Sequence, residues 1–116
     1  MTDDLLGTPV PGWLPPAAPV GETLDGRYVR LERMDADAHA ADLHRAYSGH
    51  DQLWDYMPYG PFPSAAGYHR WAKDTASGAD PMFYVLRDKE TGHCGGVASY
   101  LRITPGAGSI EVGHIC

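Results

Sequence analysis

The sequence predicts an α+β fold, in which an antiparallel sheet of about four strands carries two helices. Residues 82–116 contain three runs rich in Val, Ile, Tyr and Leu, and the connections between them are short enough only for antiparallel neighbours. Upstream, one alternating run is followed by two stretches whose apolar residues recur at helical spacing. Because the strands do not alternate with the helices along the chain, the pattern favours an antiparallel sheet covered by helices over a parallel one.

Residues 1–23 are expected to form an extended arm. Five prolines are interleaved with glycines in this stretch, and proline has no backbone N–H to donate to a helix or a sheet. Residues 24–116 then make up one domain, because a chain of 116 residues is too short for two separate cores. No internal repeat is visible.

The first strand and the first helix follow the arm. The strand is predicted at residues 26–34, where Val29 and Leu31 share one face of an alternating run. Asp35 offers a side-chain cap to a helix that Gly49 closes. The apolar stripe of this helix consists of Ala36, Ala40, Leu43 and Tyr47.

An aromatic loop and a second helix come next. Residues 50–63 hold five aromatic or other apolar side chains among prolines. This segment is too apolar for a solvent-exposed loop, so it is expected to pack against the rest of the protein. Ser64 is the predicted cap of the second helix, and Gly78 ends it. Its helically spaced residues are Tyr68, Trp71, Ala72 and Thr75.

The remaining strands are predicted at residues 82–87, 96–104 and 109–116. In the last run, alternation places His114 and Cys116 on the face of Val112, and Glu111 on the other face. A carboxylate in an apolar strand either faces solvent or lies in a cleft, where partial burial would raise its pKa and suit it to general-base catalysis.

Composition excludes several function classes. The net charge of -6 gives the long-range field the wrong sign for a general nucleic-acid or anionic-membrane surface. The sequence shows neither an apolar run long enough to span a membrane nor a secretory signal, so the expected location is the cytoplasm. Two distant cysteines predict buried or partly buried thiols and no disulfide framework.

Three kinds of site fail a test of spacing. No two of the six histidines stand four residues apart as metal ligands on a helix, so no metal site is predicted. Ser99 and Ser109 lie in or beside strands without a nucleophile-elbow pattern. The glycines at 95–96 and 106–108 precede strands, whereas a phosphate cradle needs the free N–H groups at the start of a helix.

Several segments in order carry a resemblance to a known family. They are LDGRYVRLE from residue 24, WDYMPYGPF from 54, FYVLRDKETG from 83, GVASYLRI from 96 and GSIEVGHI from 108. As a set they resemble the GNAT superfamily of acetyl-CoA-dependent N-acetyltransferases, in the branch that includes the ribosomal-protein N-terminal acetyltransferases. The resemblance covers about residues 24–116.

The resemblance implies a role for three groups of residues. The backbone of His114, Ile115 and Cys116 would pair with the pantetheine arm of acetyl-CoA, and Glu111 would remove a proton from the amine that is acetylated. The rings of Trp54, Tyr56 and Tyr59 would border the acceptor site, or else simply fill the gap between helix and sheet. The implied acceptor is the primary amine of a small molecule or a peptide, and the sequence does not specify which.

The chain departs from the family pattern at its end. The glycine-bearing helix start that holds the pyrophosphate in this family would follow the strand at 109–116, which predicts an incomplete domain, truncated in the fourth strand, that is inactive alone. The alternative is a small noncatalytic module that pairs, or self-associates, through its exposed last strand.

Overall fold

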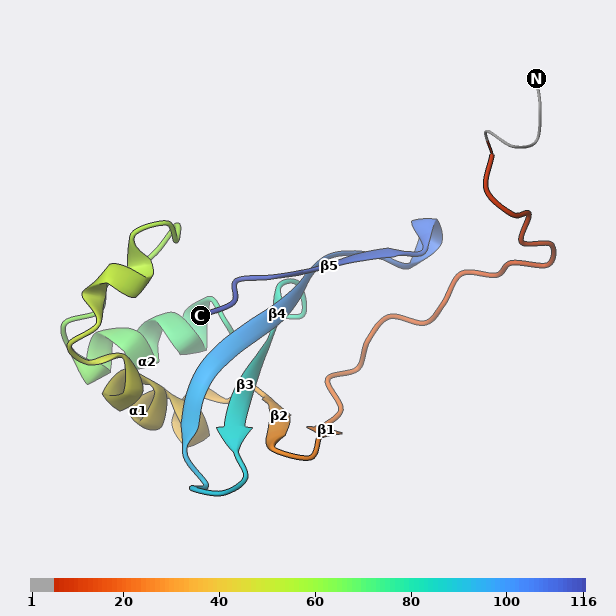
Figure 1. The fold of residues 1–116 in the computed structure, drawn as a ribbon. Helices are drawn as coiled ribbons and strands as arrows, with labels where there is room; N and C mark the ends of the chain where they lie inside the picture. Colours follow the sequence, from red (N-terminus) through yellow and green to blue (C-terminus); the bar gives the residue numbers. More distant parts are fainter. Residues whose placement is uncertain (1–5) are drawn as a thin grey trace.

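One curled antiparallel sheet with the strand order β1-β2-β3-β4-β5 separates the helices from the N-terminal segment (Figure 1). The structure, a computed structural model, describes residues 6–116. The strands are β1 Leu24–Asp25, β2 Val29–Arg33, β3 Met82–Asp88, β4 Cys94–Thr104 and β5 Ser109–Gly113. The helices are α1 Ala36–Tyr47 and α2 Ala65–Asp74, with short 3-10 turns η2 Asp51–Trp54 and η3 Pro105–Ala107. The predicted α+β class with two helices is confirmed.

The sheet has one strand more than the sequence predicts. In β1, Leu24 pairs with Leu31 and Asp25 pairs with Arg30 of β2. The turn between the two strands is closed by the Gly26 N–H, which donates to the Val29 carbonyl at 2.9 Å. A strand of two residues is too short to show an alternating pattern, which is why it could not be predicted from the sequence.

Both helices begin where their caps predict. The Asp35 carboxylate accepts a hydrogen bond from the Asp37 N–H at 3.0 Å, and the Ser64 hydroxyl oxygen accepts one from the Gly67 N–H at 3.0 Å. The predicted stripe of α1 is buried, and His39, which sequence analysis did not place, is buried with it. These caps and stripes are local features, which explains why the pattern alone located them.

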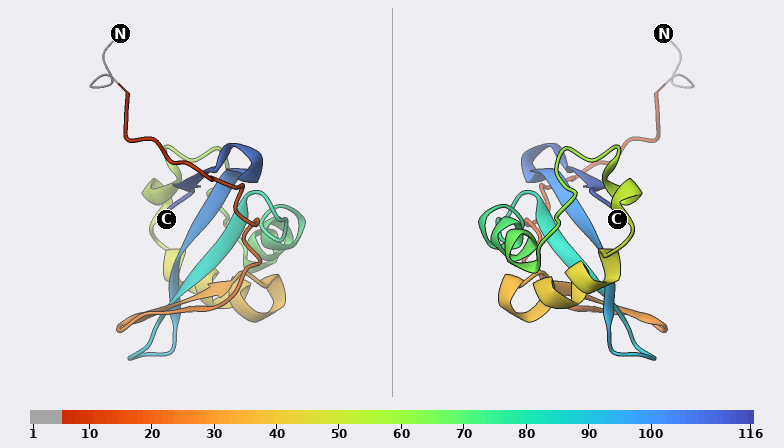
Figure 2. Two further views of the ribbon diagram at one scale, coloured as in Figure 1. Left: turned by 90° about the vertical axis from the view of Figure 1, so that its right-hand side faces the viewer. Right: turned by 90° about the vertical axis from the view of Figure 1, so that its left-hand side faces the viewer.

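The helices cover one face of the sheet and form the core there (Figure 2). Leu43, Tyr68, Phe83 and Val85 are its largest fully buried side chains. Cys94 is also buried and Cys116 partly so, and both are free thiols, as predicted. Neither helix within residues 6–116 has the length and apolar character needed to cross a membrane.

Residues 6–23 contain no helix or strand and run along the other face of the sheet (Figures 1 and 2). The Tyr84 hydroxyl of β3 donates to the Glu22 carbonyl at 2.9 Å, which ties the end of this segment to the sheet. Nearer its start, Trp13 lies against Gly108 at the β4–β5 turn. Residues 1–5 of the predicted arm lie outside the described part of the chain.

Candidate active site at the end of β5

The pairing of β5 with β4 is interrupted by a bulge at His114. Gly113 is opposite Ser99, but Cys116 exchanges two backbone hydrogen bonds with Val97, at 2.8 and 3.0 Å. From Gly113 to Cys116 the chain advances by three residues, whereas β4 advances by only two, from Ser99 to Val97. The β5 side therefore has one extra residue, which defines a bulge. His114 takes it up with a φ of +50°, a value that few residues other than glycine adopt.

This bulge corrects two sequence predictions. The strand predicted over 109–116 ends at Gly113. Because one extra residue reverses the alternation, Cys116 does not share a face with Val112 as predicted. It lies opposite Val97, on the helix-covered side, and packs against the core.

The bulge leaves backbone groups open. Within residues 6–116, the N–H groups of His114 and Ile115 donate to no protein acceptor, and β5 pairs on one side only. The Ile115 side chain is exposed. Beside this edge, an open groove of about 1030 Å³ passes Cys116 and Gly96 and reaches the β3–β4 hairpin, where Lys89 lines it. Two free N–H groups next to an open groove can bind an oxygen that carries or gains negative charge.

The His114 ring packs against two aromatic side chains. It stacks on Tyr59 with ring centroids 5.8 Å apart and contacts Phe83 at 5.4 Å. The Tyr59 hydroxyl lies 3.2 Å from Nδ1 of His114, within hydrogen-bond distance. Burial raises the pKa of Tyr59 to about 12, with a smaller contribution from Cys116, so this phenol stays protonated at neutral pH.

Two further tyrosines lie behind the bulge. The Tyr47 hydroxyl donates to the Cys116 carbonyl at 3.2 Å. The Tyr68 hydroxyl is fully buried and has no hydrogen-bond partner within residues 6–116. Burial raises the pKa of both phenols well above the ordinary value, so each is a neutral donor.

Of the three rings expected to border an acceptor, the structure brings only Tyr59 to the bulge. Trp54 is 5% exposed and packs edge-on against Tyr47 and Phe62, which fits the alternative that it fills the core. Gly60 is required there, since a Cβ at this position would lie 2.6 Å from the Trp54 ring. Tyr56 is fully exposed.

Glu111 lies on the open part of the β4–β5 pair. Its residue is opposite Leu101, its side chain is about half exposed, and its carboxylate is 3.4 Å from Nε of the still more exposed Arg102. The structure therefore places it at a solvent-accessible ion pair rather than in a closed cleft. An exposed pair of this kind contributes about 0 to 1 kcal/mol to stability.

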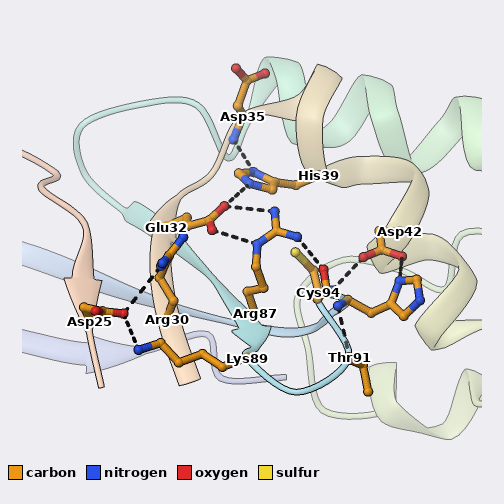
Figure 3. A network of polar contacts seen from close by, with 12 residues as sticks. Asp25, Arg30, Glu32, Asp35, His39, Asp42, Arg87, Lys89, Thr91 and Cys94 are labelled. Atoms are coloured by element: carbon orange, nitrogen blue, oxygen red, sulfur yellow. Dashed lines mark hydrogen bonds and ion pairs between the residues drawn. The ribbon is translucent and has the colours of Figure 1, made fainter. Parts of the chain in front are cut away.

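A polar network that was not predicted from the sequence supports the other end of the sheet (Figure 3). Glu32 of β2 accepts two hydrogen bonds from the Arg87 guanidinium, at 2.7 and 3.0 Å. It also lies 3.0 Å from Nε2 of His39, whose Nδ1 accepts from the Asp35 N–H at 2.9 Å. Since Nδ1 is an acceptor, the ring hydrogen is on Nε2 and is donated to Glu32. Arg87 first and His39 second hold the pKa of Glu32 down at about 2.

A second part of this network joins α1 to the start of β4. The Asp42 carboxylate accepts from the Cys94 N–H at 2.6 Å and also contacts Arg45 and His93. The Cys94 N–H is the main cause of a lowered Asp42 pKa. In the part of the chain described, no three His, Cys, Asp or Glu side chains are arranged to hold a metal ion.

Comparison with known proteins finds solved structures that closely resemble this chain. A GCN5-related N-acetyltransferase from Brucella melitensis superposes with a TM-score of 0.86 at 31% identity, covering 91% of this chain and 49% of that one. A probable acetyltransferase of the GNAT family from Chromobacterium violaceum gives a TM-score of 0.82 at 31% identity, covering 94% and 56%. The chain thus spans about half the length of these structures. No family model and no curated protein matches it.

Proposed function

Because the chain belongs to the GNAT superfamily of N-acetyltransferases, we propose that the complete protein transfers an acetyl group from acetyl-CoA to a primary amine of a small molecule or a peptide. The observation that carries this proposal is the bulge at His114, whose free N–H groups lie at the unpaired edge of β5. In a regular edge strand every second N–H bonds to the neighbouring strand, whereas at this bulge two consecutive N–H groups are free for a ligand.

Acetyl-CoA supplies an activated acetyl thioester. The N–H groups of His114 and Ile115 suit its carbonyl oxygen, because acyl transfer puts negative charge on that oxygen and preorganised backbone donors stabilise the charge. The free edge of β5 can hold the extended pantetheine by strand addition. The backbone of Cys116, which the sequence also predicts for this contact, is already bonded to Val97 through both its N–H and its carbonyl, so the contact would rest on His114 and Ile115. Tyr59 is the residue of the aromatic loop whose side chain reaches His114. Glu111 is the carboxylate that the sequence predicts as acceptor of the amine proton.

We also propose that residues 1–116 alone bind acetyl-CoA weakly and do not turn over. A diphosphate is usually held by the free N–H groups at the start of a helix. The starts of α1 and α2 are occupied by their own caps, Asp35 and Ser64, and Asp37 adds negative charge to the first turn of α1.

Two measurements test these proposals. Incubating the complete protein with acetyl-CoA and either spermidine or a short peptide with a free N-terminus should give an acetylated product by mass spectrometry. No product with any amine of a broad panel would refute the function. For residues 1–116, calorimetric binding of acetyl-CoA at micromolar affinity, about 8 kcal/mol, would contradict the proposed weakness.

The predicted proton acceptor is tested in the complete protein. Glu111→Gln removes the charge with little change of shape and should lower the rate of acetyl transfer if the carboxylate accepts the proton. Arg102→Gln is the matched control, because it breaks the same exposed ion pair and leaves the carboxylate in place. An unchanged rate and pH profile in Glu111→Gln would place the base elsewhere.

A noncatalytic module that pairs through its last strand is the second candidate, and the open edge of β5 favours it. The isolated chain should then self-associate through residues 109–116. Sedimentation velocity tests this, and a monomer at all concentrations would count against it.

A further inference from the structure

We infer that the His114 imidazole, oriented by the Tyr59 hydroxyl, is the group that takes the proton from the attacking amine. The inference rests on the proposed function and names a residue of the same site. His114 lies in the bulge itself, next to the free N–H groups that suit the thioester carbonyl. The proton acceptor and the two N–H donors therefore belong to two consecutive residues. Glu111 instead lies in the regular part of β5 and faces an exposed arginine.

The hydrogen bonding of the ring leaves one nitrogen without a partner among residues 6–116. Nδ1 is within 3.2 Å of the Tyr59 hydroxyl, and Nε2 makes no hydrogen bond to any residue between 6 and 116. By contrast, both ring nitrogens of the structural His39 are used. To accept a proton at Nε2, the neutral ring must carry its hydrogen on Nδ1 and donate it to the Tyr59 oxygen.

The surroundings fix the orientation of the ring. Tyr59 contacts it from the aromatic loop and Phe83 contacts it from β3. Trp71 of α2 packs against both of these rings, with its ring centroid 4.5 Å from that of Tyr59 and 5.6 Å from that of Phe83. Tyr59 is the one titratable group of these, and it stays protonated at neutral pH because burial raises its pKa. Cys116, two residues along, affects Tyr59 electrostatically. Tyr59 is therefore a positioning residue and His114 the proton acceptor.

The step balances as ordinary acyl transfer. The amine nitrogen forms a bond to the acetyl carbon, the carbon–sulfur bond breaks, and the sulfur leaves with the electron pair as the CoA thiolate. The proton of the amine passes to Nε2 of His114, which then returns it to the thiolate or to water. Neither an oxidant nor a further reactant is needed.

The first test is made by NMR and needs no activity. In the chain labelled with ¹⁵N histidine, long-range ¹H–¹⁵N spectra should show His114 with hydrogen on Nδ1, and Tyr59→Phe should shift it towards the Nε2–H form, because the acceptor oxygen is lost. An Nε2–H form in the unmodified chain, or no change in Tyr59→Phe, overturns the inference whatever the activity.

The second test is kinetic and uses the complete protein with spermidine or the peptide amine. His114→Gln should lower kcat by about 100-fold or more and abolish the acid limb of the pH profile, while KM for acetyl-CoA changes little. Tyr59→Phe should lower kcat less and keep the limb. His50→Gln is the matched control, because His50 is exposed and its side chain makes no capping bond.

The two outcomes separate the claims. An active protein in which His114→Gln keeps the rate and the pH profile refutes the role of His114 and leaves the acetyltransferase function standing. A complete protein that acetylates no amine refutes the proposed function, and the inference about catalysis falls with it.

Discussion

The strand pair β4–β5 contains two bulges, and only one of them is closed by the protein. At the first, Leu101 is opposite Glu111 and Thr104 is opposite Ser109, so the extra residue is on β4, where Arg102 has a φ of +49°. The N–H groups of Arg102 and Ile103 both donate to the Asp80 carboxylate, each at 3.0 Å. At the second bulge, His114 has nearly the same φ, but no residue between 6 and 116 accepts from its N–H.

This difference separates structural from functional irregularity. Polar groups that the chain satisfies itself, like those at Asp80, contribute to the free energy of unfolding. Polar groups that it leaves open at an accessible edge are satisfied by water, which a ligand can displace, so they are available for binding. Mutations that remove the partner of a satisfied polar group should therefore lower the free energy of unfolding. Mutations at the open bulge should change ligand binding and leave the free energy of unfolding unchanged.

The largest expected effect on stability is at the closed Glu32 network. The pKa of the Glu32 carboxyl is lowered from 4.5 to about 2 in the folded protein. The stabilisation by this carboxylate is therefore fully present above about pH 4.5 and is lost as the pH falls towards 2. Glu32→Gln should lower the free energy of unfolding by about 3 kcal/mol at pH 7. Urea denaturation at several pH values should show this difference shrinking below pH 4.5. A difference that does not change with pH would contradict the charge as its cause.

The next effect is expected at the closed bulge. Asp80→Ala removes the acceptor of two N–H groups and should destabilise the chain by about 2 kcal/mol, whereas Asp80→Asn keeps one carbonyl acceptor and should cost less. Thermal unfolding of the three proteins checks the order. Equal stability of all three would mean that the first bulge is as open as the second.

The smallest effect distinguishes two buried phenols. Tyr47→Phe removes a hydroxyl that donates to Cys116 and should destabilise the chain by about 1 kcal/mol. Tyr68→Phe removes a buried hydroxyl without a partner and should be neutral or stabilising by up to about 1 kcal/mol. Each variant is the control for the other, since both delete one oxygen from a buried ring. A loss of stability in Tyr68→Phe would show that its hydroxyl is satisfied.

Local signals in the sequence were sufficient for most of the fold. Asp35 and Ser64 identify the helix starts because a cap acts on the next turn of its own helix. The short connections after β3 and β4 define the meander because so few residues allow only antiparallel return. Neither signal depends on the rest of the structure.

The site was harder to predict because its geometry depends on remote pairing. The sequence around Arg102 and His114 does not indicate a bulge, because positive φ is typical of glycine and neither residue is a glycine. Glu32, His39 and Arg87 come from three elements and meet only in the folded chain. The sequence placed Glu111 correctly in the last strand, but its exposure depends on what covers the β4–β5 pair.

The second bulge also makes the length of β5 as important as its chemistry. The residue added at His114 decides that Cys116, and not its neighbour Ile115, packs against the core. Deleting one residue there would restore a regular ladder, bond one of two consecutive N–H groups to β4 and turn each following side chain to the opposite face. Substitutions in this segment alter one contact at a time, whereas a single insertion or deletion would invert everything beyond it.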